Sequence, residues 1–154
     1  MISDTLDTPV RTRDSLRRAL TRGLPAAARI VLGLVFLVFG LDGFLHFTPQ
    51  PDPSSIPAAA LAFGMAMMKT GYLFQLVKGT EVVVAVLLLA NRFVALGLAL
   101  IAPVIVNIVA FHAFLGPSGL PLALSLLGLE LYLAFHYRSV YRPMLAWHAT
   151  SGAP

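Results

Sequence analysis

Four long apolar runs dominate the hydrophobic pattern of the chain, and short segments that contain polar residues, Pro or Gly separate them. At about 1.5 Å of rise per residue, a helix of roughly 20 residues covers the ~30 Å hydrocarbon core of a bilayer. The runs lack the alternating pattern of strands, and within lipid only helices and closed barrels satisfy every backbone group. The pattern therefore predicts four transmembrane helices, at residues 25–47, 72–90, 93–115 and 119–137.

A shorter apolar segment stands between the first two runs. Residues 48–56 are rich in Pro, which fixes φ and favours a rigid exit from the first span. Residues 57–69 are rich in Ala and Met, but at about 20 Å a helix of this length is too short to cross the bilayer. We expect a short helix that lies on the outer face or dips into it. The alternative is a helical lid that is packed on the bundle.

The composition supports a membrane protein. Apolar residues make up 58% of the 154 residues and charged residues 12%, and the mean hydropathy is +0.83. Soluble domains have about 45–50% apolar and about 25% charged residues. An ordinary soluble enzyme, a disordered tail and a disulfide-stapled secreted domain are therefore poor interpretations. The chain has no Cys, which excludes thiol–disulfide chemistry and Cys-ligated iron–sulfur clusters.

Basic residues are concentrated at one end of the predicted helices, although the net charge is only +4. They precede the first span, occupy the turn between spans two and three, and follow span four: Arg11, Arg13, Arg17, Arg18, Arg22, Arg29, Arg92, Arg138 and Arg142. The opposite loops carry only Asp52 and Lys69, so the positive-inside rule places both termini in the cytoplasm. No nucleic-acid module is recognisable, and nucleic acid is not an expected partner.

The predicted fold class is all-α: an integral membrane four-helix bundle with a short extra outer-face helix and an Arg-rich cytoplasmic N-terminal segment. We divide the chain into a polar basic tail at 1–24, a four-span domain at 25–143 and a C-terminal tail at 144–154.

Seven polar residues in or beside the spans are candidates for a pocket. An ionisable group at the centre of a span costs about 2.5–3.5 kcal/mol on insertion scales, so it needs a partner, water or a function. Counted from the outer end of each span, their depths run from ~1.5 Å to ~16 Å, in the outer half or near the midplane. The candidates are Asp42, His46, Lys78, Glu81, Asn107, His112 and Glu130.

Helical spacing suggests which of these residues meet. Asp42 and His46 are four residues apart and Lys78 and Glu81 three, so each pair shares a helix face, and two facing pairs would form a polar pocket. Asn107 lies about 140° around the helix from the His five residues later, so both cannot point into one pocket.

Each candidate also has a purely structural interpretation. Lys78 can neutralise Glu81 or Asp42 to hold the bundle together, and His112 can be an interfacial anchor. Glu130 has no charged neighbour within four residues and is then a protonated, hydrogen-bonding carboxyl. The glycines Gly33, Gly40, Gly43 and Gly97 are expected to let helices approach closely.

Three segments resemble the DoxX-like family of membrane proteins. Residues 29–40, Arg-Ile-Val-Leu-Gly-Leu-Val-Phe-Leu-Val-Phe-Gly, resemble the opening helix of that family, and residues 78–90, with Glu81 before an apolar run, resemble its second helix. Residues 107–112, Asn-Ile-Val-Ala-Phe-His, are similar to the end of its third helix. The resemblance implies a four-helix, multi-pass protein of the bacterial inner membrane, linked to quinone-coupled oxidation or to membrane redox complexes. Asp42 departs from the family pattern, in which many members have Lys shortly after the second glycine.

Three functions remain open from the sequence. The first is a quinone-associated redox subunit in which Asp42, His46, Glu81 and His112 surround the quinone head group, with a partner protein supplying the rest of the chemistry. The second is a proton-coupled transporter with a site built from Glu81, Asn107 and Glu130, in which a second copy of the chain supplies symmetry. The third is a structural or assembly subunit. No metal or haem is expected, since the two outer histidines lack a second matched pair.

Overall fold

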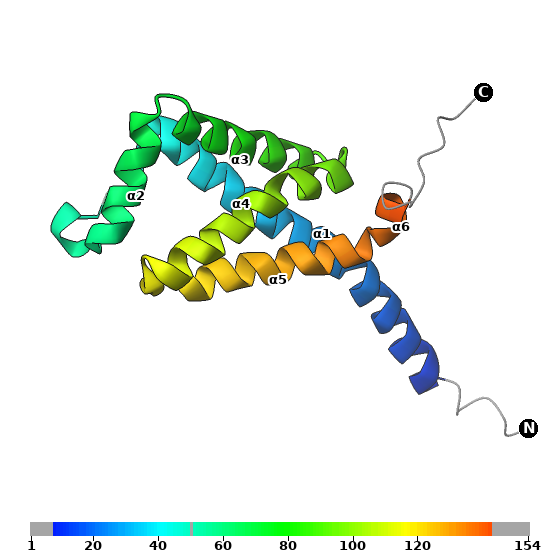
Figure 1. Cartoon of the computed structure of the whole chain (residues 1–154). Coiled ribbons are helices and arrows are strands. Elements are labelled where there is room, and N and C mark those ends of the chain that lie inside the picture. The colour runs from blue at the N-terminus through cyan, green and yellow to red at the C-terminus, as the bar shows by residue number, and fades with distance from the viewer. Residues whose placement is uncertain (1–7, 50, 143–154) are drawn as a thin grey trace, which may run out of the picture.

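The computed structural model describes residues 8–49 and 51–142, and all regular structure in these residues is helical. This confirms the predicted all-α class. The longer elements, labelled in Figure 1, are α1 (Thr8–Leu45), α2 (Ala58–Lys69), α3 (Leu73–Leu89), α4 (Val94–Phe114), α5 (Leu120–His136) and α6 (Arg138–Tyr141). Two 3₁₀ turns, η1 (Pro53–Ser55) and η2 (Pro117–Gly119), lie in the connections.

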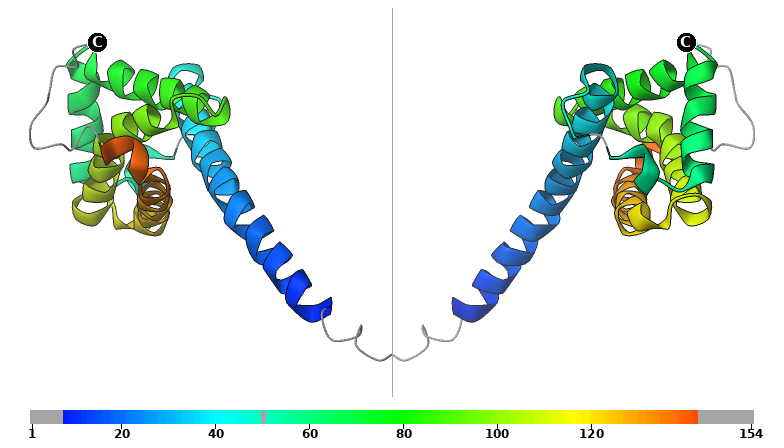
Figure 2. Two further views of the ribbon diagram at one scale, coloured as in Figure 1. Left: turned by 90° about the vertical axis from the view of Figure 1, so that its right-hand side faces the viewer. Right: turned by 90° about the vertical axis from the view of Figure 1, so that its left-hand side faces the viewer.

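The four long helices form a closed bundle. α1 packs against α3, α3 against α4, α4 against α5, and α5 returns to α1. The short helix α2 lies at one end of this bundle and α6 at the other, and these are called the α2 end and the α6 end below (Figure 1). The N-terminal part of α1 projects beyond the α6 end, away from the other helices (Figure 2).

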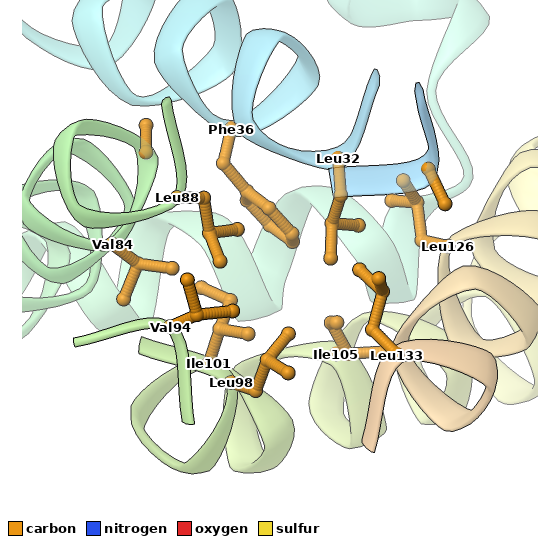
Figure 3. Close-up of a cluster of buried hydrophobic side chains, with 12 residues drawn as sticks. Leu32, Phe36, Val84, Leu88, Val94, Leu98, Ile101, Ile105, Leu126 and Leu133 are labelled. Carbon is orange, nitrogen blue, oxygen red and sulfur yellow. The ribbon is translucent and has the colours of Figure 1, made fainter. Parts of the chain in front are cut away.

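The bundle has a compact apolar interior. Side chains from all four long helices point toward one another in Figure 3, and several of them are fully buried: Leu32, Phe36, Val84, Leu88, Leu98, Ile101, Ile105 and Leu133. The outer surface is also apolar, because residues such as Leu76, Val106 and Leu131 remain about 60% exposed. Helices that are apolar on both their inner and outer faces are typical of a protein surrounded by lipid.

Three helical stretches are long and apolar enough to cross a membrane: Gly23–Leu45, Val94–Phe114 and Pro117–His136. α3 has 17 residues and passes this criterion only together with α2, from which it is bent by 91°. α3, α4 and α5 each lie one residue inside the predicted ranges at both ends. These apolar helices indicate a membrane protein in contact with the lipid bilayer.

The α2–α3 corner explains why the fourth apolar stretch is broken. Gly71 has a φ of +77°, which favours glycine, and it terminates α2. Thr70 stabilises the corner, because its hydroxyl donates to the Met67 carbonyl and accepts from the backbone N–H of Leu73. α2 then packs against the neighbouring end of α4, where the rings of Phe63 and Phe111 lie with their centroids 5.6 Å apart. The short helix is thus packed on the end of the bundle.

The expected division at residue 24 does not appear as a break in the backbone. α1 begins at Thr8 and continues through Pro25 to Leu45. A proline removes one backbone hydrogen bond from a helix, and the Ala and Arg residues around it have high helix propensity, so the helix tolerates it here. Residues 1–7 of the predicted basic tail and the whole predicted C-terminal tail at 144–154 lie outside the described residues.

Close packing of α1 on α3 depends on two of the predicted glycines. A Cβ atom on Gly40 would lie 2.8 Å from Cγ2 of Val82 and 3.1 Å from the backbone nitrogen of the same residue. A Cβ atom on Gly43 would lie 2.6 Å from Cδ of Lys78. Real Cβ atoms are rarely this close. Because Gly40 and Gly43 have no Cβ atom, α1 can approach α3 to this distance. The interpretation of these glycines as packing residues is confirmed.

Replacing Gly40 with Ala is expected to lower the free energy of unfolding in detergent by about 1–3 kcal/mol, the usual cost of overpacking. Gly79 is the matched control, because it lies within α3 and a Cβ there would meet nothing within 4 Å. Gly79→Ala is expected to be neutral or to stabilise by up to about 1 kcal/mol. Equal effects of the two substitutions on denaturation in mixed micelles would contradict the packing role of Gly40.

Candidate functional site

A cavity of about 220 Å³ lies between the four long helices, toward the α2 end. It is mainly apolar, but two charged side chains and one imidazole contribute to its wall. The lining residues are Phe36 and Phe39 of α1, Lys78 and Glu81 of α3, Ile108 and His112 of α4, and Leu122, Ala123 and Leu126 of α5. Three of the seven residues predicted from the sequence therefore meet here.

Lys78 and Glu81 form the predicted ion pair. Nζ of Lys78 lies 2.9 Å from Oε2 of Glu81, and the Glu81 side chain is only 4% exposed. The two glycines of α1 hold the pair in place, since Gly43 lies against the alkyl part of Lys78 and Gly40 against Cβ of Glu81. The pair gives the cavity hydrogen-bond donors and acceptors without a net charge.

His112 is positioned by the connection between α4 and α5. Its Nδ1 lies 2.7 Å from the carbonyl oxygen of Gly116. Because a carbonyl oxygen only accepts, Nδ1 must carry the proton of this hydrogen bond. Among the described residues Nε2 has no hydrogen-bond partner. The ring also lies directly against Gly119, where a Cβ atom would collide with it.

Asp42 and His46 do not form the predicted side-by-side pair. α1 ends at Leu45, and His46 takes a left-handed conformation with a φ of +50°. The spacing of four residues therefore no longer places the two side chains on one helix face. The Asp42 carboxylate accepts hydrogen bonds from the backbone N–H and the hydroxyl of Thr48, both at 2.7 Å, and the His46 side chain is exposed. Neither residue lines the cavity at the α2 end.

Asn107 lies on a different side of α4 from His112, in agreement with the helical period. It lines a separate cavity of about 390 Å³ in the corner between α2, α3 and α4, together with Phe63, Met67, Leu73, Val77, Pro103 and Val104. Apart from Asn107, the lining residues of this cavity are apolar.

Glu130 lies toward the α6 end and lines a third cavity, of about 330 Å³, with residues of α4, α5 and α6. The hypothesis that the polar residues gather around one shared cavity is therefore wrong for four of the seven. Depth along each span was predictable, but the direction of each side chain depends on helix rotation. The same finding rules out one site made of Glu81, Asn107 and Glu130, because these residues line three different cavities.

Sequence reasoning missed several residues that shape the site. Phe36 and Phe39 line the cavity. The helical period could have identified Phe36, because it lies four residues before Gly40 and therefore on the same face of α1, which packs on α3. The sequence gives Arg29 no role in helix packing, but it is buried and its guanidinium donates to the carbonyl of Leu88 near the end of α3. A cation is favoured near a helix C-terminus by the helix dipole.

Comparison with known proteins gives one relative. The chain is 37% identical over 105 residues to the uncharacterized protein YwoB of Bacillus subtilis, an alignment that covers 63% of this chain and 66%, just under two thirds, of that protein. No protein-family model matches the chain. No solved structure matches it either. The name of the relative assigns no activity, so function has to be argued from the site.

The site combines aromatic walls, a neutralised ion pair and an imidazole. Among the side chains that the structure describes, those of residues 23–49 and 51–142, no three His, Asp or Glu gather in a way that could hold a metal ion. Hydrogen-bond donors on an otherwise apolar wall can contact the polar oxygen atoms of an organic group. Lys78 can donate to such oxygens, and His112 can exchange a proton through Nε2.

Proposed function

We propose that this protein is a quinone-associated membrane subunit that binds a quinone head group in the cavity at the α2 end. The observation that supports this proposal is the convergence of Lys78, Glu81 and His112 on one largely apolar cavity. At about 220 Å³ the cavity is smaller than the roughly 300–1,000 Å³ of sites that enclose a drug-sized ligand. It therefore suits a single ring whose tail leaves between the helices into lipid.

The residues of the cavity have distinct roles in this proposal. Phe36 and Phe39 offer aromatic surface to the ring. Lys78 donates a hydrogen bond to a carbonyl oxygen, and Glu81 keeps that ammonium ion neutralised within the apolar wall. A bound quinone supplies two-electron, two-proton redox chemistry. His112, held through Nδ1 by the Gly116 carbonyl, accepts or releases a proton at Nε2.

We also propose that the protein belongs to the DoxX-like family and that its α6 end faces the cytoplasm. Each of the three DoxX-like segments lines the cavity, through Phe36, Glu81 and His112 in turn, which supports a place among the DoxX-like proteins of the bacterial inner membrane. Arg92 and Arg138 both lie at the α6 end of the bundle, where α3, α4 and α5 begin or end. Under the positive-inside rule this end faces the cytoplasm, and the quinone cavity lies in the outer half. In this proposal a partner redox protein exchanges electrons with the quinone.

Direct binding of duroquinone, a quinone without a tail, tests the proposal. The purified protein in nanodiscs is expected to bind it saturably, and His112→Ala is expected to weaken binding at least about 10-fold, equivalent to about 1.4 kcal/mol. His46→Ala is the matched control, because that imidazole is exposed and outside the cavity. Calorimetric titration against empty nanodiscs measures both.

Two results would overturn the proposal. One is the absence of saturable binding to the folded protein, and the other is equal affinity for the His112→Ala and His46→Ala variants. Extraction of the gently purified protein provides an independent measurement, because a native quinone should co-purify with His46→Ala and be depleted in His112→Ala.

A further inference from the structure

The cavity at the α6 end is separate from the proposed quinone site and takes no part in it. It measures about 330 Å³ and lies between α4, α5 and α6. Its walls are mostly small and apolar, with Leu98, Ala99, Ala102 and Ala134. Its polar residues are Glu130, Arg138 and Tyr141.

Glu130 is buried in this cavity, and none of the described residues pairs with its Oε2 atom. The residue is only 5% exposed, and its Oε2 atom forms no hydrogen bond with any described residue. Among the residues whose side chains the structure describes, 23–49 and 51–142, the single ion pair is the one between Lys78 and Glu81. Most buried polar atoms have a hydrogen-bond partner, and a missing one costs about 1–3 kcal/mol. The carboxyl group is therefore in a position to gain from a ligand.

The two polar neighbours of Glu130 are engaged elsewhere. The hydroxyl of Tyr141 donates to the carbonyl oxygen of Ala95 at 2.7 Å. The guanidinium of Arg138 donates to the carbonyl oxygen of Phe135 at 3.1 Å and lies 4.3 Å from the centre of that residue's ring. The cavity thus presents one buried acidic group on an alkyl wall, and the exposed Arg138 and the ring of Tyr141 complete its lining.

The chemistry of the wall selects the kind of ligand. An inorganic cation such as Ca²⁺ needs six or more oxygen ligands, and the cavity offers one carboxyl group. An anion would be attracted by Arg138, but that guanidinium is exposed and held against Phe135, whereas the carboxyl group inside the cavity would repel an anion. An organic cation gains an ion pair with the carboxylate, while its alkyl or aryl groups gain contact with the alanines.

We propose that the cavity at the α6 end is a second ligand site, which binds an apolar organic cation of the alkyl- or arylammonium class through Glu130. Small residues leave room for the ammonium substituents. The ion pair is strengthened by the surrounding apolar groups, since charges attract more strongly where water is excluded.

Paired probes test the charge requirement. Benzyltrimethylammonium and neopentylbenzene have nearly the same shape, and only the first is charged. The protein in nanodiscs is expected to bind the cation at least about 10-fold more tightly than the neutral compound, after subtraction of binding to empty nanodiscs. Glu130→Gln is expected to remove this difference. Asp52→Asn, which deletes an exposed carboxylate in the connection between α1 and α2, is expected to leave it unchanged.

A second variant covers the case in which Glu130→Gln fails to fold. Ala102→Leu retains the carboxyl group but fills the cavity, so it is expected to weaken binding of benzyltrimethylammonium at least about 10-fold. Equal affinity for the charged and neutral probes would overturn the proposal, and so would full cation affinity in folded Glu130→Gln or in Ala102→Leu. Duroquinone binding should be unaffected in Glu130→Gln, so that failure of this site and failure of the quinone site are distinguishable.

Discussion

Replacement of Lys78 with Met is expected to lower the free energy of unfolding by about 3 kcal/mol. The substitution leaves the carboxylate of Glu81 buried without its counter-ion, and breaking a buried ion pair in this way costs about 3–5 kcal/mol. We expect the lower end of that range, because the Lys78 side chain is 20% exposed and its removal admits some solvent. Denaturation in mixed micelles at neutral pH measures the loss.

A double-mutant cycle separates the ion pair from the size of the side chains. Lys78→Met combined with Glu81→Leu is expected to regain most of the lost stability, because an apolar pair leaves no buried charge. Lys69→Met is the matched control, since this lysine is exposed at the end of α2, and its replacement should change stability by less than about 0.5 kcal/mol. A loss of less than about 1 kcal/mol in Lys78→Met would show that the pair contributes little.

Truncation of Phe36 to Ala is the second large effect, with an expected loss of about 3 kcal/mol. Phe36 is 1% exposed and lies between the apolar core and the cavity at the α2 end. Phe→Ala changes in protein cores cost about 3–5 kcal/mol, and part of this is the void left behind. In lipid the transfer of apolar surface contributes little, so the loss of packing contacts dominates and the lower value applies.

Phe39 provides the comparison for this prediction. It lines the same cavity but is 46% exposed on the outside of the bundle, so Phe39→Ala is expected to cost less than about 1.5 kcal/mol. The difference between the two variants in the same denaturation experiment measures how much the buried ring contributes. Losses of equal size would contradict the assignment of Phe36 to the core.

Some of the site was predictable from local spacing. Lys78 and Glu81 are three residues apart on one helix, so the spacing allowed this pair, and the structure selects it over the alternative partner Asp42. The opposite faces of Asn107 and His112 follow in the same way from the helical period. The predicted pairing of Asp42 with His46 is wrong because the helical period holds only inside a helix, and α1 ends between the two residues.

The grouping of residues from different helices was not predictable. Whether Glu81 meets His112 or Glu130 depends on the rotation of α3, α4 and α5 about their own axes. Hydropathy carries little information about that rotation, because both the core and the lipid-facing sides of these helices are apolar. The position of His112 further depends on Gly116 and Gly119 in the following turn, which shape the backbone around the ring.

The sequence by itself determined the helical class, the apolar character of the surface, the limits of α3, α4 and α5 to within one residue, and the ion pair of α3. These features follow from the length of the apolar runs and from contacts within one helix. Tertiary structure alone decided that five of the seven polar candidates divide among three cavities, which Asp42 and His46 do not line, and that Oε2 of Glu130 is buried without a hydrogen bond to any described residue. The physical reason is that helix rotation and the break between α2 and α3 arise from side-chain packing between segments far apart in the chain.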